Sequence, residues 1–309
     1  MHSLIIIILT SLVLLLQILG VQLPFSMVAA GLAIGVLLIG LPHGGLDQKI
    51  GLSLFSKFPR HIALPMFLAS YLLIAAVVIL GWVIAPMVTI LAFFGLSAWH
   101  FGLEEETRER FTMVQRLSII ARGGMVIWIP AYFQGSVVAD LITLILPAGD
   151  SFVAEQVVSV IQICSPIALG LLIFDLISAG GIASQPTFAL SPKYLHRIRV
   201  FAFAVLFATV DPLVSFGVYF CGWHSIRGLA HLRDQFQLTN RDLAWNLLPI
   251  SSVAIALFAV GFLVSSSVNL IAPALVQTVF IGLSAVAVPH LLLHIVTDSI
   301  GTKVQGAIS

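Results

Sequence analysis

Four short stretches place a histidine beside an apolar segment of the chain: GLPHGGLD (40–47), SAWHFGLEEE (97–106), CGWHSIRGLAHL (221–232) and VAVPHLLLHIV (286–296). Imidazole is the commonest side-chain ligand of transition metals. Ionisable residues at membrane depth are candidates for function, because an unpaired polar group in hydrocarbon is costly. For a single histidine, a hydrogen bond across a helix interface is an equally good explanation. For four at similar depth, a shared metal ion is the better one. The predicted ligands are His43, His100, His224, His290 and His294.

The spacing of the histidines indicates which of them could bind a metal ion and which could not. His290 and His294 are four residues apart and would project from one helix face, about 6 Å apart along the axis, which suits two ligands of one ion. His224 and His231 are seven residues apart, or about 10 Å along a helix. We therefore favour His224 and expect His231 to lie beside the site or at a helix interface. The remaining histidines lie at the terminus or in basic loops and are expected to be solvated or to face lipid headgroups: His2, His61 and His196.

Two carboxylates follow predicted ligands by about one helical turn: Asp47 after His43, and Glu104 after His100. Each could accept a hydrogen bond from a ligand imidazole and fix its tautomer. We expect them to orient ligands rather than to transfer protons, although Asp47 could equally be a simple helix-end carboxylate. Pro42 and Gly44–Gly45 should loosen the helix around His43. The role of Asp211, a buried carboxylate that needs a partner, is open.

Aromatic side chains flank two of the histidines. As isolated residues they would be core or interface-belt groups. Around a metal site they could instead line a cavity for a long apolar ligand, and as such they are the predicted substrate-binding residues: Trp99, Phe101, Tyr219, Phe220 and Trp223.

Composition identifies the broad class of protein. The 309-residue chain is 60% hydrophobic and only 9% charged, and its mean hydropathy is +1.12. Soluble domains carry about 25% charged residues, so the chain is expected to be one integral membrane domain, residues 1–309, built from transmembrane helices. A net charge of +1 gives no indication of nucleic-acid binding. The two cysteines lack metal-ligand spacing and are expected to be core residues.

Apolar stretches of about 20 residues, long enough to span a bilayer, are expected near 3–21, 27–43, 62–85, 87–103, 117–134, 155–178, 199–222, 244–266 and 270–297. A tenth candidate, 137–148, is short. If it crosses, 11 of the 14 Lys and Arg share one side, which the positive-inside rule makes cytoplasmic. Ten spans also place His43, His100, His224 and His290 near cytoplasmic helix ends. We therefore expect about ten spans and a multi-pass protein of the cell inner (plasma) membrane.

In order, GLPHGGLD, SAWHFG, YFCGWHSIRG and PHLLLH resemble the Brp/Blh family of membrane carotene dioxygenases, from the second helix to the last. The resemblance implies cleavage of β-carotene at its central double bond by O2, to two retinal molecules, at non-haem Fe(2+) held by histidines. It also implies a link to retinal-binding rhodopsins. Members often carry a further histidine four residues after the one matched by His224. Here that residue is Gly228, so a fourth ligand would come from His290 or His294.

Three other classes of protein remain open. A di-iron membrane desaturase or hydroxylase usually needs several HxxxH and HxxHH clusters, and this chain has one HxxxH and no HH pair. A metal or small-molecule transporter often has charged residues along a pathway and repeated halves, and no repeat is evident. A purely structural partner of a rhodopsin would tolerate loss of the histidines.

Overall fold

The computed structural model describes residues 2–103, 112–147, 149–178 and 192–300. These residues form helices joined by short turns, and they contain no strand. The all-helical class is therefore confirmed. The chain divides into two compact units, which are described separately below. The first comprises Met1–Val28, Ile90–Leu144 and Gly149–His224. The second comprises Ala29–Thr89, Ile145–Ala148 and Ser225–Ser309. That the chain is one integral membrane domain stays a prediction.

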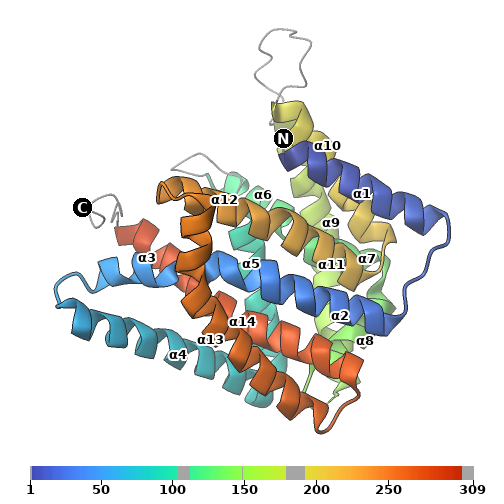
Figure 1. The fold of residues 1–309 in the computed structure, drawn as a ribbon. Coiled ribbons are helices and arrows are strands. Elements are labelled where there is room, and N and C mark those ends of the chain that lie inside the picture. Colours follow the sequence, from blue (N-terminus) through green and yellow to red (C-terminus); the bar gives the residue numbers. More distant parts are fainter. Residues whose placement is uncertain (1, 104–111, 148, 179–191, 301–309) are drawn as a thin grey trace. The chain divides into compact units, whose positions relative to one another are not determined.

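The first unit contains most of the middle of the chain (Figure 1). Helix α1 packs along α10, α10 packs on α7 and α11, and α9 packs on α6 and α7. The elements are α1 (His2–Ile18), α5 (Pro86–Leu103, from Ile90 on), α6 (Met113–Gly123), α7 (Met125–Phe133), α8 (Gly135–Ile145), α9 (Ser151–Ser178), α10 (Pro192–Thr209), α11 (Pro212–Tyr219) and the π-helical turn η3 (Phe220–Ser225).

The second unit is built around α14, which packs on α4, α13 and α3. Its apolar core gathers side chains from α3, α4, α12, α13 and α14, including Leu46, Phe67 and Leu293. The elements are α2 (Phe25–Gly35, from Ala29 on), the π-helical turn η1 (Val36–Gly40), the 3-10 turn η2 (Leu41–Gly44), α3 (Asp47–Leu54), α4 (Arg60–Ile84), α12 (Ile226–Gln235), α13 (Asn240–Ser266) and α14 (Ile271–Ile300).

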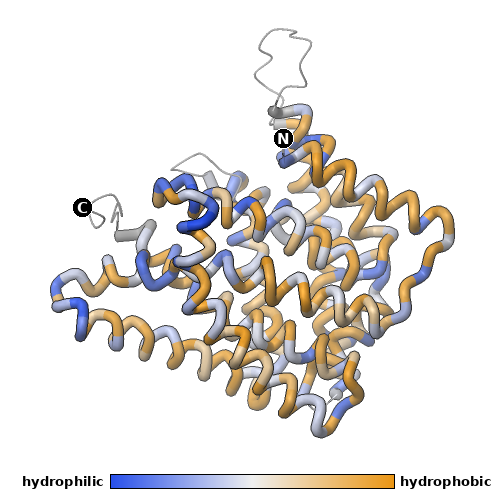
Figure 2. Tube along the Cα trace, viewed as in Figure 1, coloured by the Kyte–Doolittle hydropathy of each residue, from blue (hydrophilic) through white to orange (hydrophobic). Residues whose placement is uncertain are grey.

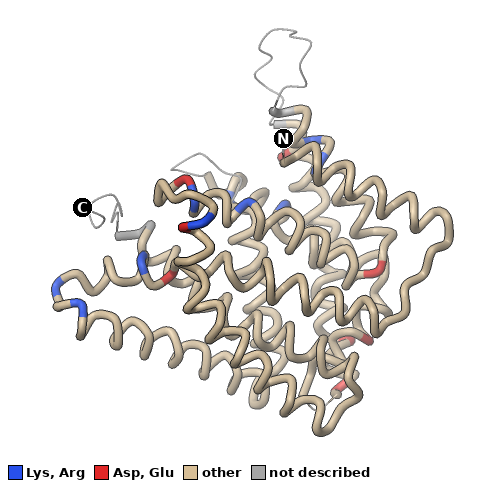
Figure 3. The backbone as a smooth tube through the Cα atoms, viewed as in Figure 1, with Lys and Arg blue, Asp and Glu red and all other residues tan. Residues whose placement is uncertain are grey.

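The outer faces of these helices are apolar, as expected for helices that face lipid. Helix α4, for example, exposes Leu72, Leu73 and Val77, and Figure 2 shows apolar residues along most of α4, α13 and α14. Among the described residues of the second unit, the basic ones lie on α3, at the turn between α3 and α4, on α12 and at the start of α13 (Figure 3). Exposed apolar area of this extent marks a surface that meets a membrane.

The number of spans differs from the sequence expectation. Among the described residues, six helices are long and apolar enough to cross a membrane, or seven if α7 and α8, bent by 118°, form one broken span. The expected span 117–134 is divided at Gly124 into α6 and α7, and the short tenth candidate lies mostly in α8. Helix α1 is apolar but has only 17 residues. The ten-span count and the placement of the histidines at cytoplasmic ends are therefore not confirmed.

The side chain of Asp211 explains why a second expected span is divided into two helices. The expected span 199–222 is interrupted between α10 and α11, where the Asp211 side chain accepts hydrogen bonds from the backbone N–H groups of Leu213 (2.9 Å) and Val214 (3.2 Å). Pro212 then occupies the first turn of α11, where its missing N–H costs nothing. The expectation that Asp211 is buried is wrong, because its side chain is exposed, and the partner that it finds is the start of its own helix.

Candidate metal centre

His43 lies in an irregular part of the helix that runs from Phe25 to Leu54. The backbone passes from the π-helical turn η1 into the 3-10 turn η2 before α3 begins. Such irregular turns are frequent at functional sites, because they change the direction of a side chain within a helix. A β-carbon on Gly45 would lie 2.8 Å from Leu247 Cδ2 and 3.0 Å from the Pro42 carbonyl oxygen, so the backbone comes close to α13 at this position. The loosening that Pro42 and Gly44–Gly45 predict is present.

The orientation of the His43 ring is set by its own turn. Its Nδ1 hydrogen bonds to the backbone carbonyl of Gly40. A carbonyl only accepts, so Nδ1 carries the proton and the lone pair of the neutral ring is on Nε2. A histidine whose second nitrogen is bonded to a carbonyl in this way has the usual arrangement of a metal ligand.

His290 is held by Asp47. The Nδ1 of His290 donates to the two carboxylate oxygens of Asp47 at 2.8 and 2.9 Å. Both side chains are buried, with exposed fractions of 7% and 4%. The lone pair of a neutral His290 ring is therefore also on Nε2. The carboxylate that follows His43 in the sequence thus orients an imidazole from α14.

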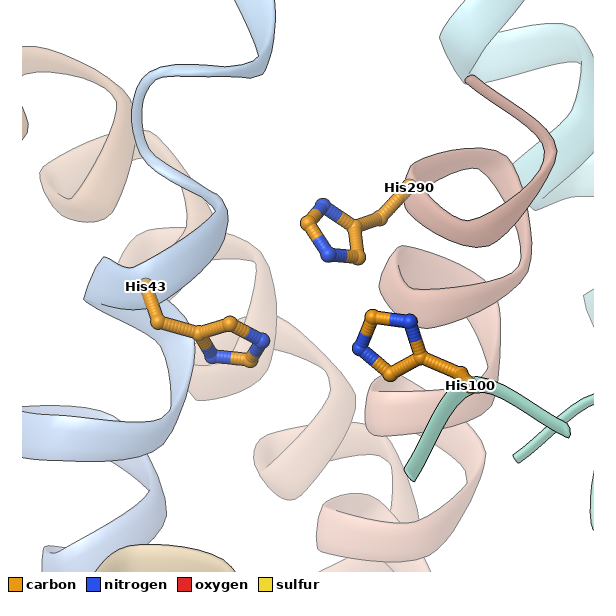
Figure 4. A group of neighbouring side chains, drawn as sticks. All are labelled: His43, His100 and His290. Atoms are coloured by element: carbon orange, nitrogen blue, oxygen red, sulfur yellow. The ribbon is translucent and has the colours of Figure 1, made fainter. Parts of the chain in front are cut away.

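The second unit brings three histidines and this carboxylate together. The rings of His43 and His290 point toward one another (Figure 4), with centroids 5.3 Å apart. The rings of His290 and His294 are 4.6 Å apart. One ligand atom each from Asp47, His290 and His294 lies within 4.8 Å of the others. Imidazole nitrogens together with a carboxylate oxygen are suitable ligands for a transition metal.

Tyr71 is the residue of this group that the sequence analysis missed. Its hydroxyl lies 3.1 Å from Asp47 Oδ2 and 2.9 Å from the backbone carbonyl of Val286, and it can donate to either acceptor. Tyr71 therefore links α4, α3 and α14 at the carboxylate that holds His290. A signal was present in the sequence, because Tyr71 is one of only four tyrosines and interrupts a strongly apolar helix.

Position 228, where the resemblance leads us to expect a histidine, lies against His43. A β-carbon on Gly228 would be 3.5 Å from Cδ2 of the His43 ring, an ordinary van der Waals contact. His231, three residues further along α12, is exposed. The glycine therefore leaves the ring of His43 without a side chain from this position beside it.

The first unit contains the other two predicted ligands. The rings of His100 on α5 and His224 on η3 are 5.2 Å apart. Phe101 lies 4.7 Å from His224, and Phe220 stacks on it at 5.5 Å. His224 is only 2% exposed. It projects from a π-helical turn, whereas His43 lies in a 3-10 turn that directly follows one. Glu104, the carboxylate predicted to orient a ligand near His100, lies outside the described residues.

Four of the aromatic residues predicted to bind substrate, Phe101, Tyr219, Phe220 and Trp223, belong to a packed cluster in this unit. Tyr219 contacts the rings of Phe101, Phe203 and Phe207 at 5.2–5.7 Å. Tyr219, Phe220 and Trp223 are buried, whereas Trp99 and Phe101 are half-buried. The cluster fixes the surroundings of His224, and its contact with a substrate stays a prediction.

Helix α5 is positioned by a close crossing with α6 that the sequence analysis also missed. A β-carbon on Gly123 would overlap the Ala98 carbonyl and the Gly102 backbone, and one on Gly102 would overlap the Ile119 carbonyl. Arg122 donates to the carbonyl of Gly102 (3.0 Å) and pairs with Asp175 (2.7 Å). The crossing therefore fixes the helix segment that carries His100.

Two comparisons relate the chain to known proteins. Residues 34–298 match the family described as β-carotene 15,15'-dioxygenase. A protein named β-carotene 15,15'-dioxygenase, from uncultured marine bacterium 66A03, is 30% identical over 261 residues, which cover 84% of this chain and 90% of that protein. No solved structure matches.

Proposed function

Because the chain belongs to the β-carotene 15,15'-dioxygenase family, we propose that it cleaves β-carotene at its central double bond with O2, giving two all-trans-retinal molecules. One C=C bond breaks and two C=O bonds form, and the two atoms of a single O2 molecule balance the reaction. The name of the bacterial relative and the family description support the reaction. They also favour an oxygenase over a transporter or a purely structural protein.

We further propose that the reaction uses non-haem Fe(2+) bound by histidines. The observation that supports it best is the buried hydrogen bond from His290 to Asp47, which leaves Nε2 of that imidazole as its ligand atom. The proposed ligands are His43, His290 and His294 of the second unit and His100 and His224 of the first. Bound iron would supply a redox-active cation with positions open to O2.

Asp47 is proposed to keep the His290 proton on Nδ1 and to make Nε2 of the same imidazole a stronger metal ligand. It accepts hydrogen bonds in the structure and needs no proton transfer for this role. Glu104 is proposed to act similarly, and the aromatic residues around His100 and His224 to contact the polyene and exclude water. β-Carotene dissolves in the bilayer, so an enzyme embedded in the inner membrane meets it there. Retinal would then pass to a retinal-binding rhodopsin.

The function is tested by expressing the chain in cells that accumulate β-carotene. Loss of yellow colour and formation of retinal are expected, and addition of a membrane-permeant iron chelator before induction should prevent both. Retinal formation that persists in the purified protein after its iron has been removed and shown to be absent would refute the iron proposal and leave the cleavage reaction standing. No retinal under any condition would refute the reaction itself.

Asp47→Asn should weaken iron binding. Asparagine keeps the shape of the side chain but removes the negative charge that stabilises the His290 N–H. Loss of such a partner typically lowers metal affinity about 10- to 100-fold, and the same loss is expected in an Fe(2+) titration of the purified protein. Asp234→Asn on α12 is a matched control, because Asp234 is an exposed carboxylate paired with Arg233. Equal affinities in the two variants would contradict the role of Asp47.

Tyr71→Phe should have a smaller effect in the same direction. Removing the hydroxyl takes one donor from Asp47 and leaves the His290 hydrogen bond in place. We expect a fall in iron affinity of about 10-fold, the lower end of the range for partners outside the ligand set. Ser70→Ala serves as the control, since the Ser70 hydroxyl bonds only the Met66 carbonyl of its own helix among the hydrogen bonds described. An unchanged affinity in Tyr71→Phe would show that Asp47 needs no support from α4.

A further inference from the structure

Helix α1 precedes the segment that matches the family, which begins at residue 34. It nevertheless reaches the surroundings of a proposed ligand. The ring of His2, at the start of α1, stacks on Trp223 with centroids 4.9 Å apart and an interplanar angle of 7°. Trp223 directly precedes His224 in the turn η3. His2 was expected to be solvated or to face lipid headgroups, whereas it lies half-buried against this indole.

A second side chain, Arg199 of α10, lies against the same indole. Its guanidinium carbon is 4.0 Å from the centroid of the Trp223 ring. The guanidinium also donates to Ser3 Oγ at 3.1 Å and to His196 Nδ1 at 3.0 Å. Arg199 is only 5% exposed. A cation–π contact strengthens as the cation is desolvated, so a buried guanidinium with these partners holds the indole firmly.

The turn that carries Trp223 needs such support. A π-helical turn is rare and has no regular ladder of α-helical hydrogen bonds to fix it. Trp223 is buried at 3% exposure, so its ring cannot turn without displacing His2 or Arg199. His224 is the next residue, and its ring lies among Phe101, Phe220 and His100. A change in the position of the Trp223 ring would therefore move the His224 imidazole.

We propose that His2 and Arg199 are positioning residues that hold Trp223 against α1 and α10 and thereby fix η3 in the conformation that presents His224. Helix α1 would then contribute to the geometry of the iron site. This proposal rests on the proposed function, because it takes His224 as an iron ligand. It also gives Trp223 a role other than substrate contact.

The test compares His2→Ala, which removes the stacked ring, with His2→Phe, which keeps a ring of similar size. Gln17→Ala is the matched control, because Gln17 makes the other side-chain hydrogen bond described between α1 and α10, to the Thr209 carbonyl (3.3 Å). Each full-length protein carries a C-terminal tag and is purified in detergent. Fe(2+) titration gives the affinity, and electron paramagnetic resonance of the ferrous nitric oxide adduct reports the ligand geometry.

We expect His2→Ala to weaken iron binding about 10-fold, as loss of a supporting partner does, and to broaden the resonance. His2→Phe should restore both, and Gln17→Ala should match the unmodified protein. Arg199→Lys keeps the positive charge but loses the planar guanidinium, so its iron affinity should lie between those of His2→Ala and the unmodified protein. A merely structural contact would lower the melting temperature in His2→Ala while affinity and resonance stayed unchanged, and that result would overturn the proposal. Unmodified protein that binds no iron would overturn both this proposal and the proposed iron site.

Discussion

Cells that accumulate β-carotene and express His290→Ala are expected to stay yellow and to form no detectable retinal. His290 is the buried imidazole with the best-defined support, since its Nδ1 donates to Asp47. Alanine removes the proposed ligand atom and also leaves a buried carboxylate without its principal donor. Loss of a partner of a ligand already costs about 10- to 100-fold, so loss of the ligand itself should exceed 100-fold. Retinoids extracted from the cells and iron in the purified variant measure the two effects.

The same outcome is expected for His43→Ala, His100→Ala and His224→Ala, one at a time. If these histidines bind a single ion, each variant should lose all the iron. One iron per chain in the unmodified protein is the matching expectation, and two would favour the di-iron alternative.

Two exposed histidines supply the controls for this series. His231→Ala should be far milder than His224→Ala, although both lie in the same stretch of sequence, because His231 is exposed. His61→Ala, at the start of α4, should behave as the unmodified protein. Retention of full bleaching by the four ligand variants would eliminate the iron site.

The sequence was sufficient to single out the candidate histidines because the chain has so few polar residues. In a chain with 9% charged residues, a histidine beside an apolar segment is conspicuous, and an unpaired one in lipid would be costly. The same reasoning marked Asp47 as a carboxylate that orients an imidazole. What the sequence could not supply was its partner, because His290 lies 243 residues away. Periodicity defines one face of one helix and does not say which helix that face meets.

Breaks within helices were harder to predict than the all-helical class of the protein. The apolar stretch 117–134 contains Gly123 and Gly124 and was expected to be one helix, but α6 ends and α7 begins there. Asp211 and Pro212 interrupt another apolar stretch, since the side chain caps α11. Hydropathy averaged over about 20 residues does not detect such breaks, which depend on single caps and close contacts. The π-helical turn before His43 and the one that contains His224 are local features of the same kind.

Gly123→Ala is expected to have the largest effect of any change away from the histidines. The added β-carbon would overlap the Ala98 carbonyl and the backbone of Gly102. Neither is the end of a flexible side chain, so α5 and α6 must separate. Overpacking in a tight core costs about 1–3 kcal/mol, and a clash with backbone atoms should reach the top of that range or exceed it. A clear fall in the melting temperature of the detergent-solubilised protein is therefore expected.

Iron binding should be lost together with the helix crossing, because His100 lies on the turn of α5 between Ala98 and Gly102, and a displacement of this turn would move its imidazole. Iron content and retinal formation should drop in Gly123→Ala even in the fraction that remains folded. Gly95→Ala is the matched control on the same helix, since its β-carbon would meet nothing within 4 Å and alanine is the better helix former. If the two variants melt at the same temperature, the close approach of α5 and α6 is wrong, and with it the explanation of how the first unit positions His100.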